Sequence, residues 1–254
     1  MMIFRPLCAV ALAFAACVAY AANPQARPPA KPQVFVLGTL YKKHETIASY
    51  DLAALSRVIA AIAPDVVVLD VNPTELAERK VFPGKVEYTR VIFPYVDKRG
   101  VKAYAGEPPE PTFGEIVAAV IKAREDLKQR NPAGSAAMET YRKATYDALA
   151  ALWKDAADAN GDASEAVIEG LKRYEARMLG PVETDANHRW DTHAASVTLT
   201  AVKENPGKRV LQIAGVENLP LIRATLRASG EVELVDMETW IRANASAPAR
   251  DDAK

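Results

Sequence analysis

The clearest indication of a fold in this chain is the stretch Val34-Phe-Val-Leu-Gly-Thr-Leu-Tyr-Lys-Lys-His44-Glu45. Its first half is a run of β-branched and large apolar residues, which is typical of a buried strand. Gly38 marks a sharp turn at the carboxyl end of this strand, and polar side chains follow. Ligands of open α/β sheets bind at the carboxyl ends of the strands, so we expect His44 and Glu45 at the mouth of a site.

A helix and a second buried strand follow this stretch. Between Tyr50 and Ala63 apolar residues recur every three or four positions, which is the spacing of an amphipathic helix. Pro64 and Asp65 end this helix, and Val66–Leu69 is a continuous apolar run that indicates a strand buried on both faces. A strand, a helix and a strand in this order form a right-handed βαβ unit, so we expect a parallel sheet.

The same alternation continues on both sides of a long helical block. This block spans about residues 112–180 and is interrupted near Asn131 and Asn160, and Thr112 and Glu115 are spaced as a capping box at its start. Around the block we predict helices over 88–98, 185–203 and 219–228, and strands over 100–104, 209–215 and 232–235. The predicted fold class is α/β, with a mostly parallel sheet built from βαβ units and two halves separated by a helical insertion.

The first residues have the features of an export signal. Arg5 precedes an apolar segment, and Ala19-Tyr-Ala21 fits a cleavage site after Ala21. We therefore predict four segments: a signal peptide over 1–21, a proline-rich leader over 22–33, a single α/β domain over 34–242 and a disordered tail over 243–254. The mature chain is expected to be periplasmic or secreted and to have no transmembrane span. Lipid attachment at Cys17 is the alternative.

The composition argues against several functional classes. The chain has 32 basic and 32 acidic residues, so nothing indicates the basic face that nucleic-acid binding requires. Both cysteines, Cys8 and Cys17, lie in the predicted signal peptide, so the mature chain would have no thiolate nucleophile and no disulfide. The sequence contains no G-x-S-x-G motif, no phosphate-binding loop, no G-x-G-x-x-G and no H-E-x-x-H.

Polar side chains follow four of the predicted strands. They are Thr39, Tyr41, His44 and Glu45 after the first strand, Asp70 and Asn72 after the second, Glu107 and Glu110 after the third, and Glu217 and Asn218 after the strand over 209–215. The carboxyl ends of parallel strands share one edge of the sheet, so residues far apart in sequence can meet there. Two carboxylates and an imidazole could bind a divalent metal or share general acid and base roles. The alternative is that these residues are polar because loops lie in water.

Two of the three histidines lie in a second cluster, His188-Arg-Trp-Asp-Thr-His193. They are five residues apart, so on a helix they point in different directions and make a poor chelating pair. Arg189 and His193 share a helix face and could bind an anionic group above the strand ends. The alternative is a helix packed by Trp190, with Arg189 paired to a carboxylate.

Three segments of the chain resemble the TraB/GumN group, which belongs to a superfamily with the erythromycin esterases and the ChaN-like haem-binding proteins. Residues 37–41 lie where the family has Gly-Thr-x-His, residues 66–71 where a family strand ends in Glu, and residues 209–219 where a strand, Gly and His precede a helix. Arg189 resembles an arginine typical of the group. The resemblance implies an α/β fold whose site lies at these strand ends, with histidine and glutamate as metal ligands and base in the metalloprotease-type members.

The chain is a degenerate member in this comparison, because it lacks the family histidines. Tyr41 and Glu217 stand in the two histidine positions, and Asp70 stands in place of the glutamate. His44 could replace Tyr41 from about one helical turn away. Together with the positions after the strands and the face shared by Arg189 and His193, the resemblance predicts His44, Asp70 and Glu217 as catalytic residues and metal ligands. The predicted substrate-binding residues are Thr39, Tyr41, Arg189, His193 and Asn218. Such an oxygen-rich site would prefer Mn, Mg or Ca to Zn.

Three functions are compatible with these observations. The first is a non-catalytic or weakly active protein that binds a small molecule or a peptide in the strand-end cleft, or a haem with Tyr41 or His44 as axial ligand. The second is a metal-dependent hydrolase of peptide, ester or lactone bonds. The third is an interaction protein that uses its helical block. The missing histidines favour the first function over the second, and the ionisable residues at several strand ends favour it over the third.

Overall fold

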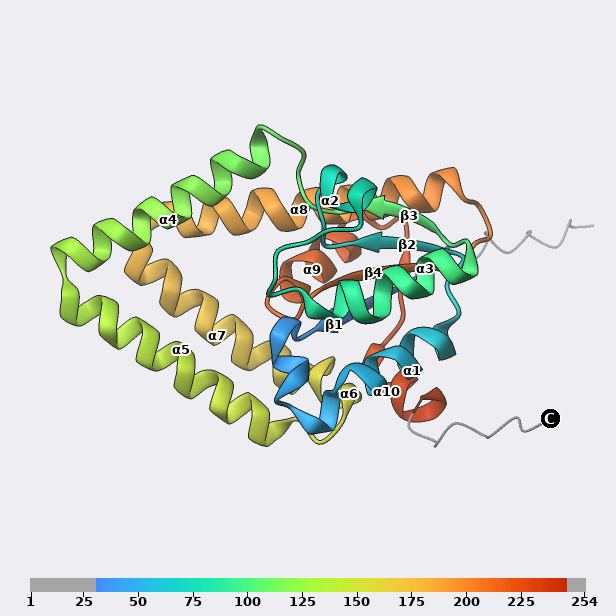
Figure 1. Cartoon of the computed structure of the whole chain (residues 1–254), viewed down its shortest axis with the longest axis horizontal. Helices are drawn as coiled ribbons and strands as arrows, with labels where there is room; N and C mark the ends of the chain where they lie inside the picture. Colours follow the sequence, from blue (N-terminus) through green and yellow to red (C-terminus); the bar gives the residue numbers. More distant parts are fainter. Residues whose placement is uncertain (1–30, 246–254) are drawn as a thin grey trace, which may run out of the picture. The chain divides into compact units, whose positions relative to one another are not determined.

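The computed structural model describes residues 31–245, and at its centre lies a sheet of five parallel strands (Figure 1). The strands are β1 (Gln33–Thr39), β2 (Val66–Leu69), β3 (Lys102–Ala105), β4 (Val210–Gly215) and β5 (Glu233–Leu234). They lie in the order β3-β2-β4-β1-β5, so β4 separates β1 from β2. The predicted α/β class with a parallel sheet and a helical insertion is confirmed, and the two halves of the chain interleave within one sheet.

Ten α-helices and three short helical turns are present in the described residues. The helices are α1 (Leu52–Ile62), α2 (Pro73–Glu78), α3 (Phe93–Arg99), α4 (Thr112–Arg130), α5 (Pro132–Leu152), α6 (Ala156–Ala159), α7 (Asp162–Leu179), α8 (Pro181–Glu204), α9 (Leu219–Ser229) and α10 (Met237–Asn244). The turns are the 3-10 helices η1 (Tyr41–Glu45) and η2 (Ala48–Tyr50) and the π-helical turn η3 (Tyr88–Ile92). No helix in this part of the chain is long and apolar enough to cross a membrane.

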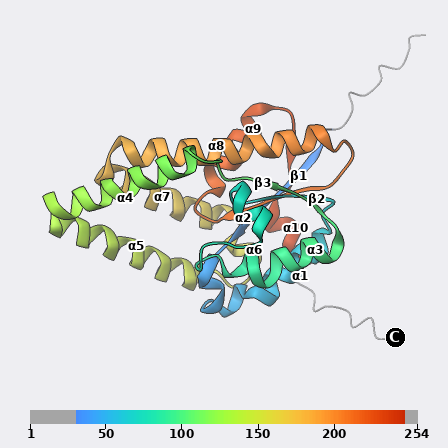
Figure 2. The same ribbon diagram turned by 45° about the horizontal axis from the view of Figure 1, so that its top comes forward.

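Helices cover both faces of the sheet. Helices α8 and α9 pack together and against the strands on one face, whereas α1 and α3 lie on the other (Figure 2). The central strands are largely apolar on both faces for this reason, and every residue of β2 and β4 is buried. The hydroxyl of Tyr50, which is itself fully buried, donates to the carbonyl of Gly38 at 2.7 Å and so ties the loop before α1 to the end of β1.

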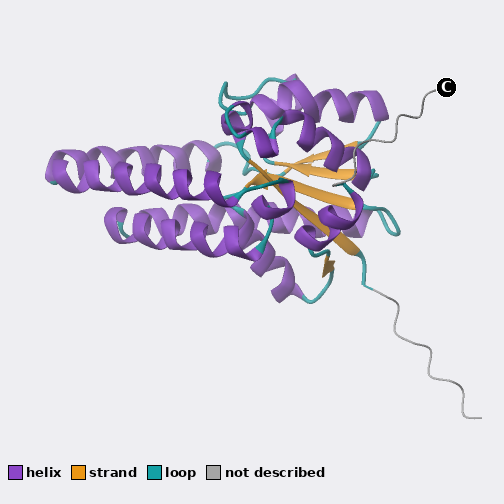
Figure 3. Cartoon of the chain, turned by 90° about the horizontal axis from the view of Figure 1, so that it is seen from below, coloured by secondary structure: helices purple, strands orange, loops and turns teal. Residues whose placement is uncertain are grey.

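The helical insertion forms an arm beyond the carboxyl ends of the strands. Helix α4 runs away from the sheet, α5 and α7 pack beside it, and α8 returns to the sheet (Figures 1 and 3). A small second core lies within the arm, where Leu127, Met138 and Leu179 are buried together with Tyr174 against them. Because the arm starts at the strand ends, its inner side faces the edge of the sheet where a site was predicted.

Several local predictions need correction. Thr112 is the first residue of α4 and makes no capping hydrogen bond; instead, the Glu110 carboxylate accepts the N–H of Gly114 at 3.1 Å. A true capping box occurs at Asn72 and Glu75, where α2 was not predicted. Helix α10 was also missed, and it continues to Asn244, two residues into the segment predicted as the tail.

The predicted terminal segments lie mostly outside the described residues. This applies to the signal peptide over 1–21, to the leader up to residue 30 and to the tail from residue 246 onward. Of the predicted leader, residues 31 and 32 have no regular secondary structure, and Gln33 already belongs to β1.

Candidate functional site

The predicted convergence of strand ends is present in the sheet. Thr39 of β1 lies beside Gly215 of β4, and Leu69 of β2 lies beside both Ile213 of β4 and Ala105 of β3. Four strands therefore end along one edge, and the polar residues that follow them meet there.

A cavity of about 850 Å³ opens at this edge, between the strand ends and the base of the helical arm. This volume is within the range of pockets that hold small organic ligands, about 300–1,000 Å³. The sheet and its loops contribute several of the predicted residues, and the arm contributes others. The lining includes Thr39, Tyr41, Asp70, Glu107, Glu217 and Asn218 from the predicted set, and Lys85, Phe113, Val117, Arg142, Tyr146, Lys172 and Trp190, which were not predicted as lining residues.

Tyr41 crosses the end of the sheet. Its backbone is in the left-handed region, with a φ of 52°, and its ring lies over Gly215. A Cβ atom at Gly215 would lie 2.2 Å from the Tyr41 hydroxyl oxygen, so only glycine leaves room for the tyrosine. A positive φ at a non-glycine residue costs about 1–3 kcal/mol and persists where the surrounding contacts enforce it. Here the contact with Gly215 and the hydrogen bond to Asp70 hold Tyr41 in place.

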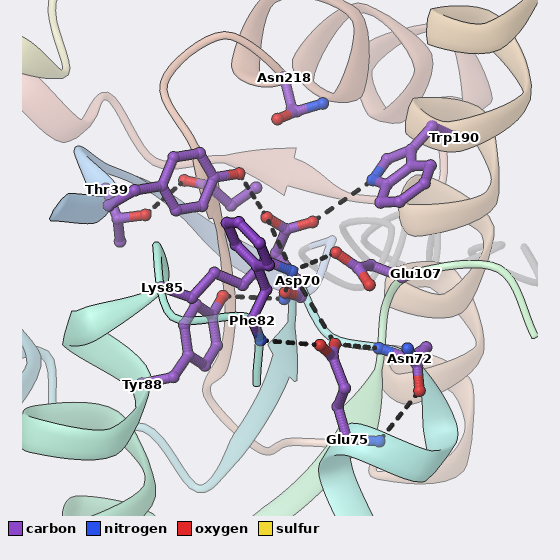
Figure 4. A network of polar contacts seen from close by, with 12 residues as sticks. Thr39, Asp70, Asn72, Glu75, Phe82, Lys85, Tyr88, Glu107, Trp190 and Asn218 are labelled. Carbon is purple, nitrogen blue, oxygen red and sulfur yellow. Dashed lines mark hydrogen bonds and ion pairs between the residues drawn. The ribbon is translucent and has the colours of Figure 1, made fainter. Parts of the chain in front are cut away.

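Asp70 is the centre of the first polar network (Figure 4). The hydroxyl of Tyr41 donates to Asp70 Oδ2 at 2.6 Å, and the indole N–H of Trp190 donates to Oδ1 at 3.4 Å. Lys85 Nζ lies 4.0 Å from Oδ2 and donates to the Asp70 carbonyl at 2.6 Å. Burial and the negative charge of Asp70 raise the pKa of the Tyr41 hydroxyl well above its usual value, so this hydroxyl is a donor and not a phenolate nucleophile.

Glu107 and Lys85 form a buried ion pair beside Asp70. Glu107 is 2 % exposed, and its Oε2 atom has no hydrogen-bond partner in the described residues. Burial and the charge of Asp70 raise the pKa of Glu107, and Lys85 opposes this shift. Burial alone would lower the pKa of Lys85, but the carboxylates of Asp70 and Glu107 raise it. The Lys85 ammonium therefore stays protonated and supplies the positive charge beside Asp70 and Glu107.

Glu217 belongs to a second polar network, which joins the sheet to the arm. Arg142 and Tyr146 of α5 both donate to its Oε1, and Lys172 of α7 lies 3.8 Å from its Oε2. Arg142 also donates to the buried Glu175 of α7 at 2.7 Å. Burial would raise the pKa of Glu217, but the charges of Lys172 and Arg142 outweigh burial and lower it. Glu217 is therefore a paired carboxylate whose partners come from the arm.

Thr39 and Asn218 line the cavity, as predicted for substrate-binding residues. The Thr39 hydroxyl donates to the Ala214 carbonyl at 3.4 Å, and the Asn218 amide donates to Asp191 Oδ1 at 2.7 Å. Burial raises the pKa of Asp191 to about 7, against the effect of Asn218. Thr39 and Asn218 therefore line the cavity, and each also makes a hydrogen bond to another residue of the protein.

His44 does not reach the cavity. It is 2 % exposed, its Nε2 accepts the N–H of Leu40 at 2.9 Å, and its Nδ1 donates to the carbonyl of Tyr50 at 2.6 Å. Burial lowers its pKa to about 4. The prediction of His44 as ligand or base is not supported, because η1 turns the imidazole back onto the main chain and both nitrogens are used there. The neighbouring Glu45 pairs with Arg90 on the surface instead.

Arg189 and His193 also lie away from the cavity. Arg189 is 3.3 Å from Glu115 and 3.8 Å from Asp185, both exposed, which agrees with the alternative of a paired arginine. His193 lines a separate surface depression beside Pro108, and burial lowers its pKa. Trp190, between them on α8, is the residue that reaches the site, since its ring packs on Phe113 at 5.2 Å between centroids.

The carboxylates of this site are not arranged around a metal position. Within residues 31–245, no group of three or more His, Cys, Asp or Glu side chains is suited to hold a metal ion. Of the predicted ligands, His44 faces the backbone, whereas Asp70 and Glu217 belong to separate networks with their own donors. The residues therefore do not fit the predicted Mn, Mg, Ca or Zn. They do not fit haem either, because the Tyr41 hydroxyl and both His44 nitrogens are already bonded.

Lys85, Trp190 and the basic side chains of the arm were missed in the sequence. The Pro83-Gly84 turn before Lys85 indicates a loop after the second strand, but not its direction. No family model, curated protein or solved structure matches the chain in comparisons with known proteins. The TraB/GumN resemblance therefore rests on three short segments alone, residues 37–41, 66–71 and 209–219.

Proposed function

We propose that the protein is a non-catalytic binding protein that takes a small organic molecule or a short peptide into the cavity at the strand ends. The observation that carries this proposal is the pairing of carboxylates inside a cavity of ligand size. Asp70 accepts hydrogen bonds from Tyr41 and Trp190 and lies 4.0 Å from the Lys85 ammonium. Glu217 accepts from Arg142 and Tyr146, so each carboxylate already has donors and a cation from the protein. We further propose that the protein is exported and is a distant TraB/GumN-like member that has lost the family reaction.

The cavity has the mixed lining that ligand binding requires. Phe113, Val117 and Trp190 give it apolar and aromatic surface, and charged and polar side chains line the rest. A ligand that covers the apolar surface gains about 25 cal/mol per Å² of apolar area buried. The metal-dependent hydrolase is the weaker alternative, because its ligand set is not brought together. An interaction role for the arm is the other alternative, and it does not involve the cavity. Large apolar residues of the arm are exposed, but none of them lines the cavity: Ile121, Tyr141, Leu152 and Val182.

The proposal can be tested with N-phenyl-1-naphthylamine, a neutral probe whose fluorescence rises in apolar surroundings. We expect saturable binding at one site in the wild type. Val117→Trp places a large ring on the cavity side of α4 and should abolish it. Ile121→Trp is the matched control, because Ile121 lies on the same helix, is 52 % exposed and does not line the cavity. Absence of saturable binding, or equal binding by both variants, would refute the proposal.

A further inference from the structure

The charges that line the cavity are unevenly distributed between its two walls. One wall, from the ends of β2 and β3, from α2 and from the loop after α2, carries three carboxyl groups and Lys85. Lys85 lies 4.0 Å from both Asp70 and Glu75 and pairs with Glu107. The other wall, from η1, α5, α7 and the loop after β4, carries four cations and one carboxylate of the cavity lining, Glu217. The second wall is therefore net positive.

Two of these cations are unpaired. Arg142 and Lys172 are near Glu217, but Lys42 and Lys43 have no carboxylate within ion-pair distance in residues 31–245. Both are exposed residues of η1 that line the cavity. Lys43 Nζ lies 4.2 Å from the centroid of the Tyr146 ring. This cation–π contact holds the Lys43 ammonium beside the cavity. Lys42 and Lys43 thus offer positive charge that the protein does not itself neutralise.

The apolar part of the lining lies with the opposite wall. Phe113 and Trp190 pack together there, and Phe82, 71 % exposed, also lines the cavity. An exposed large aromatic ring at a cavity is available to a ligand, because nothing in the folded protein covers it. A molecule with an apolar body and one negative group could place its body on these rings and its anion beside Lys42 and Lys43.

We propose that the ligand of this cavity is an organic anion with an aromatic or acyl body, and that Lys42 and Lys43 bind its negative group. This inference rests on the proposed function and adds the chemical class of the ligand. Arg189, the residue predicted to bind an anion, is held elsewhere by Glu115 and Asp185, so that role passes to η1.

The test compares two probes that differ by one sulfonate. These are neutral N-phenyl-1-naphthylamine and its anionic counterpart, 8-anilino-1-naphthalenesulfonate. Two exposed lysine contacts contribute about 1 kcal/mol or slightly more together, so we expect the anionic probe to bind about tenfold more tightly at low salt. The advantage should shrink as salt is added, because charges at a cavity mouth are screened.

The matched variants are Lys42→Gln with Lys43→Gln, and Lys98→Gln with Lys128→Gln. The second pair removes the same charge from exposed lysines that do not line the cavity. We expect only the first pair to remove the advantage of the anionic probe, with binding of the neutral probe unchanged. Equal binding of both probes by the wild type, or equal effects of the two variants, would overturn this inference and leave the proposed function standing. If neither probe binds, the proposed function itself fails.

Discussion

Replacement of His44 by phenylalanine should destabilise the fold and leave the cavity intact. The imidazole is buried and bonds two main-chain groups, the N–H of Leu40 and the carbonyl of Tyr50. Phenylalanine keeps a ring of similar size but makes neither bond. A buried polar group without a partner costs about 1–3 kcal/mol, so we expect the variant to lose about 2–5 kcal/mol of unfolding free energy at pH 7.5.

The dependence of this loss on pH tests the buried, neutral state of His44 directly. Burial lowers the pKa of His44 from 6.5 to about 4, so the unfolded chain binds its proton before the folded protein does. The stabilisation by His44 is complete above pH 6.5 and is lost as the pH falls toward 4. This difference in pKa lowers the unfolding free energy of the wild type by about 2 kcal/mol at pH 5. The variant cannot show this decrease, because phenylalanine binds no proton.

Urea unfolding of the wild type and His44→Phe at pH 7.5 and pH 5 measures both effects. We expect the difference in unfolding free energy between the two proteins to be smaller at pH 5 by about 2 kcal/mol. An equal difference at both pH values would mean that His44 is not held neutral in the fold. If His44→Phe remained folded but no longer bound N-phenyl-1-naphthylamine, His44 would have to be a residue of the binding site.

Two further predictions concern the groups around the cavity. Glu87 is fully buried, and burial raises its pKa from 4.5 to about 7 against the opposing effect of a nearby backbone N–H and of the Thr39 hydroxyl. Deprotonation of Glu87 should therefore lower the unfolding free energy of the wild type by about 3 kcal/mol as the pH rises from 4.5 to 8. Urea unfolding of Glu87→Gln should not show this decrease. Added Mn, Ca or Zn should leave the melting temperature unchanged, because Asp70 and Glu217 already have hydrogen-bond donors in the protein. If one equivalent of metal raised the melting temperature of the wild type but not that of Asp70→Ala, the hydrolase hypothesis would be restored.

Much of the fold could be predicted from local patterns. The run Val66–Leu69 is apolar at every position, and β2 has these same limits. The breaks near Asn131 and Asn160 separate the helices of the arm, because Pro132 begins a helix well and Gly161 does not continue one. These signals are local, so they do not depend on how the elements pack. The missed α2 and α10 are six and eight residues long, too short for a clear apolar period.

The position of the site followed from the strands, whereas its chemistry did not. Parallel strands align their carboxyl ends, so Tyr41, Asp70 and Glu217 could be expected at one edge from sequence alone. The direction of each side chain is set by turns only a few residues long. At η1 such a turn points Tyr41 across the end of the sheet and His44 back onto the main chain of Leu40 and Tyr50.

The sequence by itself determined most of the segments that form strands and long helices, because periodicity and chain-breaking residues act over a few neighbouring positions. Only the tertiary structure decided that β4 lies between β1 and β2 and that the arm faces the cavity. It also decided the partners of the two carboxylates, since Trp190 is 120 residues from Asp70 and Arg142 is 75 residues from Glu217. Such pairings depend on the packing of whole elements, and no local pattern in the chain records them.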